Sequence, residues 1–141
     1  MQTEPIILVA EDDEGHFHLL KRELKRIGIA WPMRRFFDGQ QALDYFGREF
    51  IQTPNRPAIF LLDIRLPKVS GTEILARIRS SDSPSLRELP VVVITSSCNP
   101  DDRTECQRLG CNAYLTKPFS AAELLSAFHS ALPGVFTGQT A

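Results

Sequence analysis

Five short runs of apolar residues alternate with longer segments whose apolar residues recur at helical spacing, and no other feature of the chain constrains its fold as strongly. The runs lie at residues 6–10, 31–37, 58–62, 90–95 and 112–116. Most of them are too short for a helix and almost wholly apolar, as expected of strands covered on both faces. The second run contains Arg34 and Arg35, which suits a strand at the edge of a sheet. Five such strand and helix units predict an α/β domain with one parallel sheet and helices on both faces.

The segments between the runs show helix start and stop signals. The last segment is the clearest, because Ser120 caps it, Glu123 completes a capping box three residues later, and Pro133-Gly134 ends it. The other helices are expected over residues 17–27, from Asp38-Gly39, from Gly71, and from Asn99-Pro100 to near Gly110. Residues 51–57 and 80–89 are expected to be loops because they are rich in helix breakers, and residues 135–141 a loose tail.

The length and the charge of the chain exclude several classes of function. The 141 residues include 16 basic and 17 acidic side chains, a formal net charge of −1. This length suffices for one hydrophobic core but not for a second domain. A near-neutral chain without a basic run lacks the excess that nucleic-acid binding needs, so we expect no nucleic-acid partner. No stretch approaches the roughly 18 apolar residues of a membrane span, and no secretory signal is present, so we expect a cytoplasmic protein without a membrane partner.

The cysteines and histidines do not form a recognisable metal site. Cys98, Cys106 and Cys111 are odd in number and lack histidines at zinc-binding spacing, so we interpret them as small buried thiols. His16 and His18 are two residues apart, which places them on different sides of a helix. We therefore expect neither histidine to have a direct chemical role, although either can contact a partner protein.

Polar side chains gather where the strands end. Doubly wound sheets bind ligands outside the carboxyl ends of their strands. After the first strand come four acidic residues, after the third Asp63, after the fourth Thr95 and two serines, and after the fifth Lys117-Pro118. The acidic run is Glu11, Asp12, Asp13 and Glu14, and the serines are Ser96 and Ser97. The sequence thus predicts that these polar groups converge on one edge of the sheet.

Each of these groups has a structural explanation when it is taken alone. An acidic run before a helix commonly caps it, and we interpret Asp13 in this way. Asp63 can form a turn, Thr95 can end a strand, and a lysine before proline is commonly a solvated surface charge. Taken together, three carboxylates would repel one another unless a cation lies between them. The joint pattern therefore predicts a divalent metal site.

The chemistry of these residue types points to phosphoryl transfer. Carboxylate oxygens with room for water and phosphate suit Mg²⁺. A lysine ammonium and a threonine hydroxyl can each donate to a phosphoryl oxygen. A carboxylate nucleophile beside these groups can receive a phosphoryl group, a reaction that needs mainly in-line positioning and charge neutralisation.

The sequence resembles the receiver domain of two-component response regulators. The matching stretches are IILVAEDD at residues 6–13, FLLDIRLP at residues 60–67 with Gly71, PVVVIT at residues 90–95 and NAYLTKPF at residues 112–119. The resemblance covers residues 6 to about 132, which leaves residues 133–141 as a short tail and no output domain. It implies a flavodoxin-like (βα)5 fold of the CheY type with strand order 2-1-3-4-5.

The resemblance also implies roles for individual residues. Asp63 matches the phosphoacceptor, and Mg²⁺ or Mn²⁺ is expected as the cofactor. The implied metal ligands are Glu11, Asp12, Asp63 and the backbone carbonyl of Arg65. The implied phosphate-binding and switch residues are Thr95, Ser96, Lys117 and Tyr114. The Lys117-Pro118 peptide bond is expected to be cis, which only a bond before proline adopts at small cost.

The resemblance further implies how the protein signals. The phosphoryl group would come from a phosphohistidine of a sensor histidine kinase or a phosphotransfer protein. Thr95 would move toward the phosphate, and Tyr114 would fill the vacated space. Residues 101–131, the fourth helix, fifth strand and fifth helix of the family, would then bind a partner or a second copy in a homodimer. The loop over residues 48–57 and the TSSCN stretch at residues 95–99 resemble stand-alone regulators of phytochrome-type kinases.

Three alternatives stay open at this stage. A dehalogenase-type phosphatase that uses Mg²⁺ also has an aspartate nucleophile, but it needs a second aspartate where this chain has Arg65. A flavodoxin-like FMN binder would place a phosphate against the acidic run, which would repel it. A receiver that binds partners without phosphorylation would not need the complete set of site residues. We expect a phosphoacceptor, not an enzyme with turnover.

Overall fold

All five expected strands are present in one parallel sheet. The protein is represented by a computed structural model, and the structure describes residues 5–53 and 57–134. The strands are β1 (Ile6–Ala10), β2 (Met33–Phe36), β3 (Pro57–Leu62), β4 (Val91–Thr95) and β5 (Ala113–Thr116). Their order is β2-β1-β3-β4-β5, and every neighbouring pair is parallel. The doubly wound α/β fold and its strand order are therefore confirmed, with Arg34 and Arg35 on the edge strand β2.

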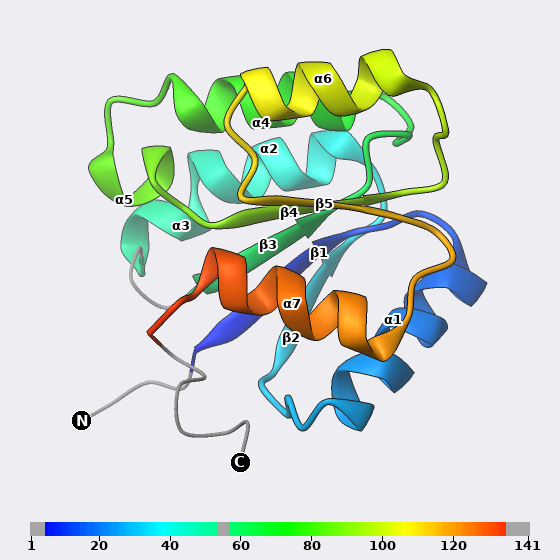
Figure 1. Ribbon diagram of the computed structural model, residues 1–141. Helices are drawn as coiled ribbons and strands as arrows, with labels where there is room; N and C mark the ends of the chain where they lie inside the picture. The colour runs from blue at the N-terminus through cyan, green and yellow to red at the C-terminus, as the bar shows by residue number, and fades with distance from the viewer. Residues whose placement is uncertain (1–4, 54–56, 135–141) are drawn as a thin grey trace.

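Helices cover both faces of the sheet (Figure 1). Helices α2, α4 and α6 lie on one side, and α1 and α7 lie on the other. The long helices are α1 (Glu14–Arg26), α2 (Gly39–Gly47), α4 (Gly71–Arg79), α6 (Pro100–Arg108) and α7 (Ala121–Ala131). Over the described residues, none of the helices is long and apolar enough to cross a membrane.

The helix caps follow the sequence signals closely. The side chain of Asp13 accepts a hydrogen bond from the backbone N–H of His16, which confirms it as the cap of α1. Ser120 and Glu123 form the capping box of α7. Pro100 occupies the first turn of α6, where its missing N–H has no helical partner to lose.

Two segments expected as loops each contain a short helix. α3 (Glu49–Gln52) contains Ile51 and Gln52 from the first expected loop. The neighbouring residue Phe50 is fully buried in the core, which holds this turn in place. α5 (Pro84–Arg87) is a single turn that Ser83 caps and Pro84 begins. Serine and proline, which indicate a loop inside a helix, here mark the start of one. Pro57 begins β3, and residues 54–56 of the expected loop lie outside the described residues, as does the expected tail at 135–141.

The sheet separates two hydrophobic clusters. Alternate strand residues point to opposite faces, so Leu8 and Leu62 belong to the cluster under α2 and α4, while Val9 and Leu61 belong to the cluster under α1 and α7. Trp31 packs against the second cluster just before β2, at the amino end of that strand.

Candidate functional site

Three carboxylates meet at the carboxyl ends of β1 and β3. Glu11 and Asp63 directly follow these strands, and each is only 5% exposed. Asp12, the next residue along the chain, is exposed. One oxygen from each carboxylate lies within 4.8 Å of the others. Hard divalent cations bind such oxygens, so these residues fit a divalent metal ion.

Lys117 reaches the same place from the end of β5. Its Nζ donates hydrogen bonds to Asp63 Oδ2 at 2.9 Å and to Glu11 Oε1 at 2.5 Å. A third contact, of 3.0 Å, joins Nζ to Nδ1 of His16 on α1. The lysine side chain is 10% exposed. The structure thus brings together four residues from three separate stretches of the chain.

The charges of this group depend on one another. Burial raises the pKa of the Glu11 carboxyl and outweighs the opposing effect of the hydrogen bond from Lys117. Burial alone would lower the pKa of Lys117, but its hydrogen bonds to Glu11 and Asp63 together raise it. The ammonium therefore stays charged through neutral pH and balances part of the carboxylate charge.

Backbone contacts fix the position of Asp63. Its N–H donates to the carbonyl of Ala10 at 3.1 Å, and its Oδ1 accepts from the N–H of Arg65 at 2.9 Å. The N–H of Gly71 donates to the carbonyl of Ile64 at 3.0 Å. A Cβ on Gly71 would lie 2.5 Å from the carbonyl oxygen of Asp63, so only glycine lets α4 approach this closely.

The hydroxyl residues at the end of β4 and just after it occupy different environments. Thr95 is fully buried, and its Oγ1 accepts a hydrogen bond from the N–H of Ser97 at 3.2 Å. Ser96 is exposed and lines a pocket together with Lys117. The N–H of Lys117 donates to the carbonyl of Thr95 at 2.8 Å, which links the ends of β4 and β5.

The Arg65 side chain points away from Asp63. Its Nη2 lies 3.0 Å from Asp102 Oδ2 on α6 and 3.3 Å from Ser97 Oγ. The hydroxyl of Ser97 donates to the same Asp102 oxygen. The loop after β3 is therefore joined to the first turn of α6 by side-chain contacts.

Tyr114 lies on β5 and is half-buried. Its register partner on β4 is Val93. The guanidinium of Arg103 on α6 lies 5.3 Å from the centre of its ring. Among the residues that the structure describes, none forms a hydrogen bond with the buried Oη of Tyr114.

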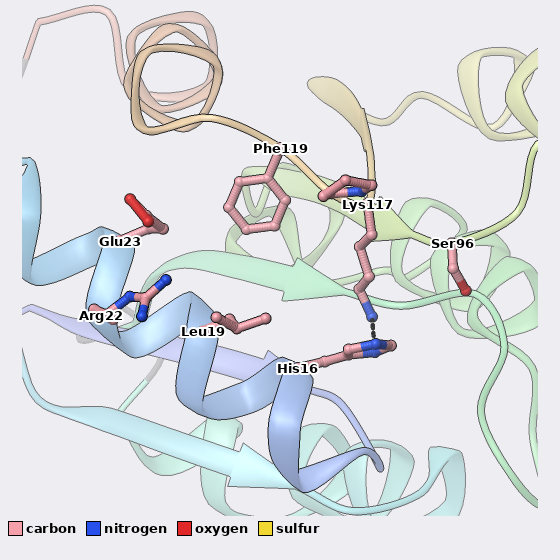
Figure 2. A pocket seen from close by; sticks show the side chains of 8 residues that line it. His16, Leu19, Arg22, Glu23, Ser96, Lys117 and Phe119 are labelled. Carbon is pink, nitrogen blue, oxygen red and sulfur yellow. Dashed lines mark hydrogen bonds between the residues drawn. The ribbon is translucent and has the colours of Figure 1, made fainter.

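A pocket of about 390 Å³ opens beside Lys117 (Figure 2). It lies between α1 and the segment that joins β5 to α7, and His16 of α1 is one of the residues that line it. Figure 2 shows the Lys117 side chain extending from its strand toward His16. The Lys117-Pro118 peptide bond at this edge is cis.

Sequence reasoning missed the position of His16. The two-residue spacing from His18 argues against a shared metal, but it does not show which histidine faces the site. The cap Asp13 provides the missing signal: His16 is three residues later, in the first turn of α1, at the end of the helix where β1 ends. His18 pairs instead with Glu14 at 3.4 Å and is 66% exposed.

One cysteine differs from the expected buried thiols. Cys106 is fully buried and Cys111 is half-buried, but Cys98 is exposed in the segment between β4 and α6. Apolar flanking residues are absent there, so nothing draws this thiol into either cluster. All three cysteines are free.

The chain is similar to known signalling proteins over most of its length. The family model for the response regulator receiver domain matches residues 7–129. The probable methanogenesis regulatory protein FilR2 of Methanothrix harundinacea is 40% identical over 119 residues, which cover 84% of this chain and 76% of that protein. Response regulator Rcp1 of Synechocystis sp. is 36% identical over 121 residues, 84% of this chain and 80% of that protein.

Solved structures agree with these sequence matches. The bacteriophytochrome response regulator RtBRR has a TM-score of 0.78 and 37% identity, and the match covers 92% of this chain and 78% of RtBRR. A crystal structure of the Mn²⁺-bound form of Rcp1 has a TM-score of 0.72 and 34% identity, with 89% of this chain and 92% of that chain covered.

Proposed function

The chain belongs to the response regulator receiver domain family, and on that premise we propose that it accepts a phosphoryl group on Asp63 and signals by contact with other proteins. The observation that supports this proposal most directly is the position of Lys117. Its ammonium contacts Asp63 and Glu11 at once, within the acidic group that fits a divalent ion.

The transfer step is a displacement at phosphorus. An oxygen of the Asp63 carboxylate attacks, the P–N bond of a donor phosphohistidine breaks, and its electron pair stays on the departing imidazole nitrogen, while the other ring nitrogen carries a proton. The product is an acyl phosphate on Asp63. The Lys117 ammonium and, after a movement, the Thr95 hydroxyl donate to phosphoryl oxygens.

The carboxylates leave a negative charge that a divalent ion would balance. Glu11, Asp12, Asp63 and the carbonyl of Arg65 would hold Mg²⁺ or Mn²⁺, and the bound ion would neutralise negative charge on the phosphoryl oxygens. Lys117 cannot do this alone, because one ammonium faces three carboxylates. The protein's own residues orient the acceptor: Asp63 is fixed through its backbone and through the N–H of Arg65.

Phosphorylation is proposed to reach the α6–β5–α7 face through Thr95 and Tyr114. The Thr95 hydroxyl accepts from the Ser97 N–H in this structure, so a movement toward phosphate would exchange that bond. Tyr114 would then move into the space that Thr95 leaves, because no hydrogen bond among the described residues holds its buried Oη in place. A phosphate-dependent change in amide NMR shifts on this face is expected, and unchanged shifts would contradict the proposal.

The kinase is proposed to be of the phytochrome type. RtBRR, which is named as a bacteriophytochrome response regulator, supports this partner through its 37% identity and its TM-score of 0.78. The protein is a substrate of that kinase and not an enzyme with its own turnover, because the phosphoryl group ends on its own Asp63.

Intact mass measured after incubation with acetyl phosphate and Mg²⁺ tests the proposal. The wild-type chain is expected to gain one phosphate, and EDTA is expected to prevent the gain. Asp63→Asn should gain none, whereas the control Asp82→Asn, which removes an exposed acid between α4 and α5, should behave as wild type. No adduct on the wild type, or an adduct on Asp63→Asn, would refute the assignment. Steady turnover of a small phosphoester would favour the phosphatase alternative.

A further inference from the structure

His16 is the one hydrogen-bonding contact of the Lys117 ammonium, among the described residues, that lies on a helix, whereas Glu11 and Asp63 directly follow β1 and β3. An ammonium has three N–H donors. Glu11, Asp63 and His16 each provide an acceptor within hydrogen-bonding distance, so each donor has a partner. The lysine is thus held on its inner side by carboxylates and on the pocket side by an imidazole.

The three bonds are not equivalent. All three involve the charged ammonium, but those to Glu11 and Asp63 also have a charged acceptor, so the attraction between opposite charges strengthens them further. The contact with His16 is a hydrogen bond from the ammonium when Nδ1 is the acceptor, and the ring proton is then on Nε2. The N–H that faces His16 is therefore the donor that a phosphoryl oxygen can take over at the lowest cost.

The position of His16 is consistent with its bond to Lys117 being the most easily replaced of the three. Its backbone is fixed by the cap Asp13, whose Oδ1 accepts from the His16 N–H at 2.9 Å. Its side chain is 41% exposed and lines the pocket beside Lys117. Figure 2 shows the imidazole and the lysine tip meeting at the opening between α1 and the end of β5.

We propose that His16 is a positioning residue for phosphoryl transfer: it keeps the third N–H of Lys117 directed toward the pocket until a phosphoryl oxygen replaces the imidazole. This role rests on the proposed function of Asp63. It differs from the role of Asp63, because His16 does not carry the phosphoryl group and its one hydrogen-bonding contact among the described site residues is Lys117; its Nδ1 lies farther away, at 3.9 Å, from Oε2 of Glu11. An N–H already directed at the place of the phosphoryl oxygen needs no reorientation during the transfer.

Three variants test the role with acetyl phosphate and Mg²⁺ as the probe. His16→Leu removes the acceptor and is expected to slow formation of the Asp63 adduct by about threefold to tenfold, the order of effect of one hydrogen bond. His16→Asn retains an acceptor atom near the place of Nδ1 and should recover most of the rate. The control His18→Leu changes the exposed histidine on the same helix and should phosphorylate at the wild-type rate.

A double-mutant cycle separates positioning from a structural effect. In a Lys117→Ala background, His16→Leu is expected to change the rate no further, because the residue through which it acts is gone. The second readout is ¹⁵N NMR of the Lys117 ammonium without metal or phosphodonor. Its N–H signal should be sharp in the wild type and in His16→Asn, and broadened by faster water exchange in His16→Leu.

The possible results distinguish this role from the proposed function. An Asp63 adduct that forms equally fast in His16→Leu and wild type, or a slowing that persists unchanged in the Lys117→Ala background, would overturn the role of His16 alone. Absence of any adduct on the wild-type chain would overturn the proposed function and this role with it. A slowing confined to the background that contains Lys117, together with the broadened ammonium signal, would support the role.

Discussion

Nζ of Lys117 lies 2.9 Å from Oδ2 of Asp63, although 54 residues separate the two in the sequence. The parallel sheet is the cause, because it brings the carboxyl ends of β3 and β5 to the same edge. The contact places a positive charge where the acidic residues would otherwise repel one another. The ammonium and a divalent ion therefore compete for the charge of the same carboxylates.

Lys117→Ala is expected to raise the affinity for Mg²⁺ or Mn²⁺ by about tenfold, because it removes a positive charge next to the ligands. Titration calorimetry measures this change. The raised pKa of Lys117 keeps the ammonium charged through neutral pH, so the difference should persist from about pH 6 to about pH 9. Lys68→Ala, which removes an exposed lysine paired with Asp38, is the control and should leave the affinity unchanged. Unchanged or weaker binding in Lys117→Ala would contradict this competition.

Gly71→Ala is expected to lower the free energy of unfolding by about 2 kcal/mol or more, because its Cβ would overlap the backbone of Asp63 and Ile64. Phosphorylation should slow as well, since relief of the overlap moves the acceptor. Gly47→Ala is the matched control at the end of α2, where a Cβ meets nothing within 4 Å. It should be neutral or stabilise by up to about 1 kcal/mol. Urea denaturation of both variants measures the contrast, and equal midpoints would show that the close approach is unimportant.

Arg79→Ala is expected to destabilise the protein by about 2–3 kcal/mol. The guanidinium donates to the carbonyls of Gly110, Arg87 and Leu89 and to Oδ1 of Asn112. It therefore joins the end of α4 to the chain before β4 and to the segment between α6 and β5. Arg77→Ala, two residues earlier, removes only an exposed pair with Glu73 and should cost about 0.5 kcal/mol or less. Thermal unfolding compares the two, and a similar loss in both would contradict a special role for Arg79.

The three thiols should react with a disulfide reagent at different rates near pH 8. Cys98 is exposed and should react at once. Burial raises the pKa of Cys106 to about 11, so this thiol stays protonated as well as inaccessible and should react only on unfolding. Burial also raises the pKa of half-buried Cys111, which should react slowly. The reactivity of Cys106 in the folded state should grow only as the pH approaches 11. Single Cys→Ser variants assign the phases, and fast labelling of Cys106 at pH 8 would contradict its burial.

Local and periodic signals predicted most of the fold. The apolar runs located all five strands, and caps such as Asp13 and Ser120 fixed where helices begin. These features depend on neighbouring residues, so they are visible in sequence. The short helices α3 and α5 were missed because the prolines and serines around them are typical of loops, and α3 is stabilised by distant contacts, the burial of Phe50 and the pairing of Glu49 with Arg34.

The site could be predicted only as a set of residue types at one edge. The acidic residues and Lys117 were expected together there, and the geometry places them together. The sequence did not indicate which way side chains point within the site. Arg65 points outward to Asp102, and His16 points inward to Lys117. Both orientations depend on how α6 and α1 pack against the sheet, which the sequence alone does not show.

The separation of the core into two clusters makes adjacent residues report on different halves of the molecule. Leu61 and Leu62 immediately precede Asp63, and they lie on opposite faces of the sheet. A methyl signal from Leu61 senses the layer of α1 and α7, and one from Leu62 senses the layer of α2, α4 and α6. Isotope labels on this single leucine pair would act as two spectroscopic probes that divide any response of the protein between its two layers.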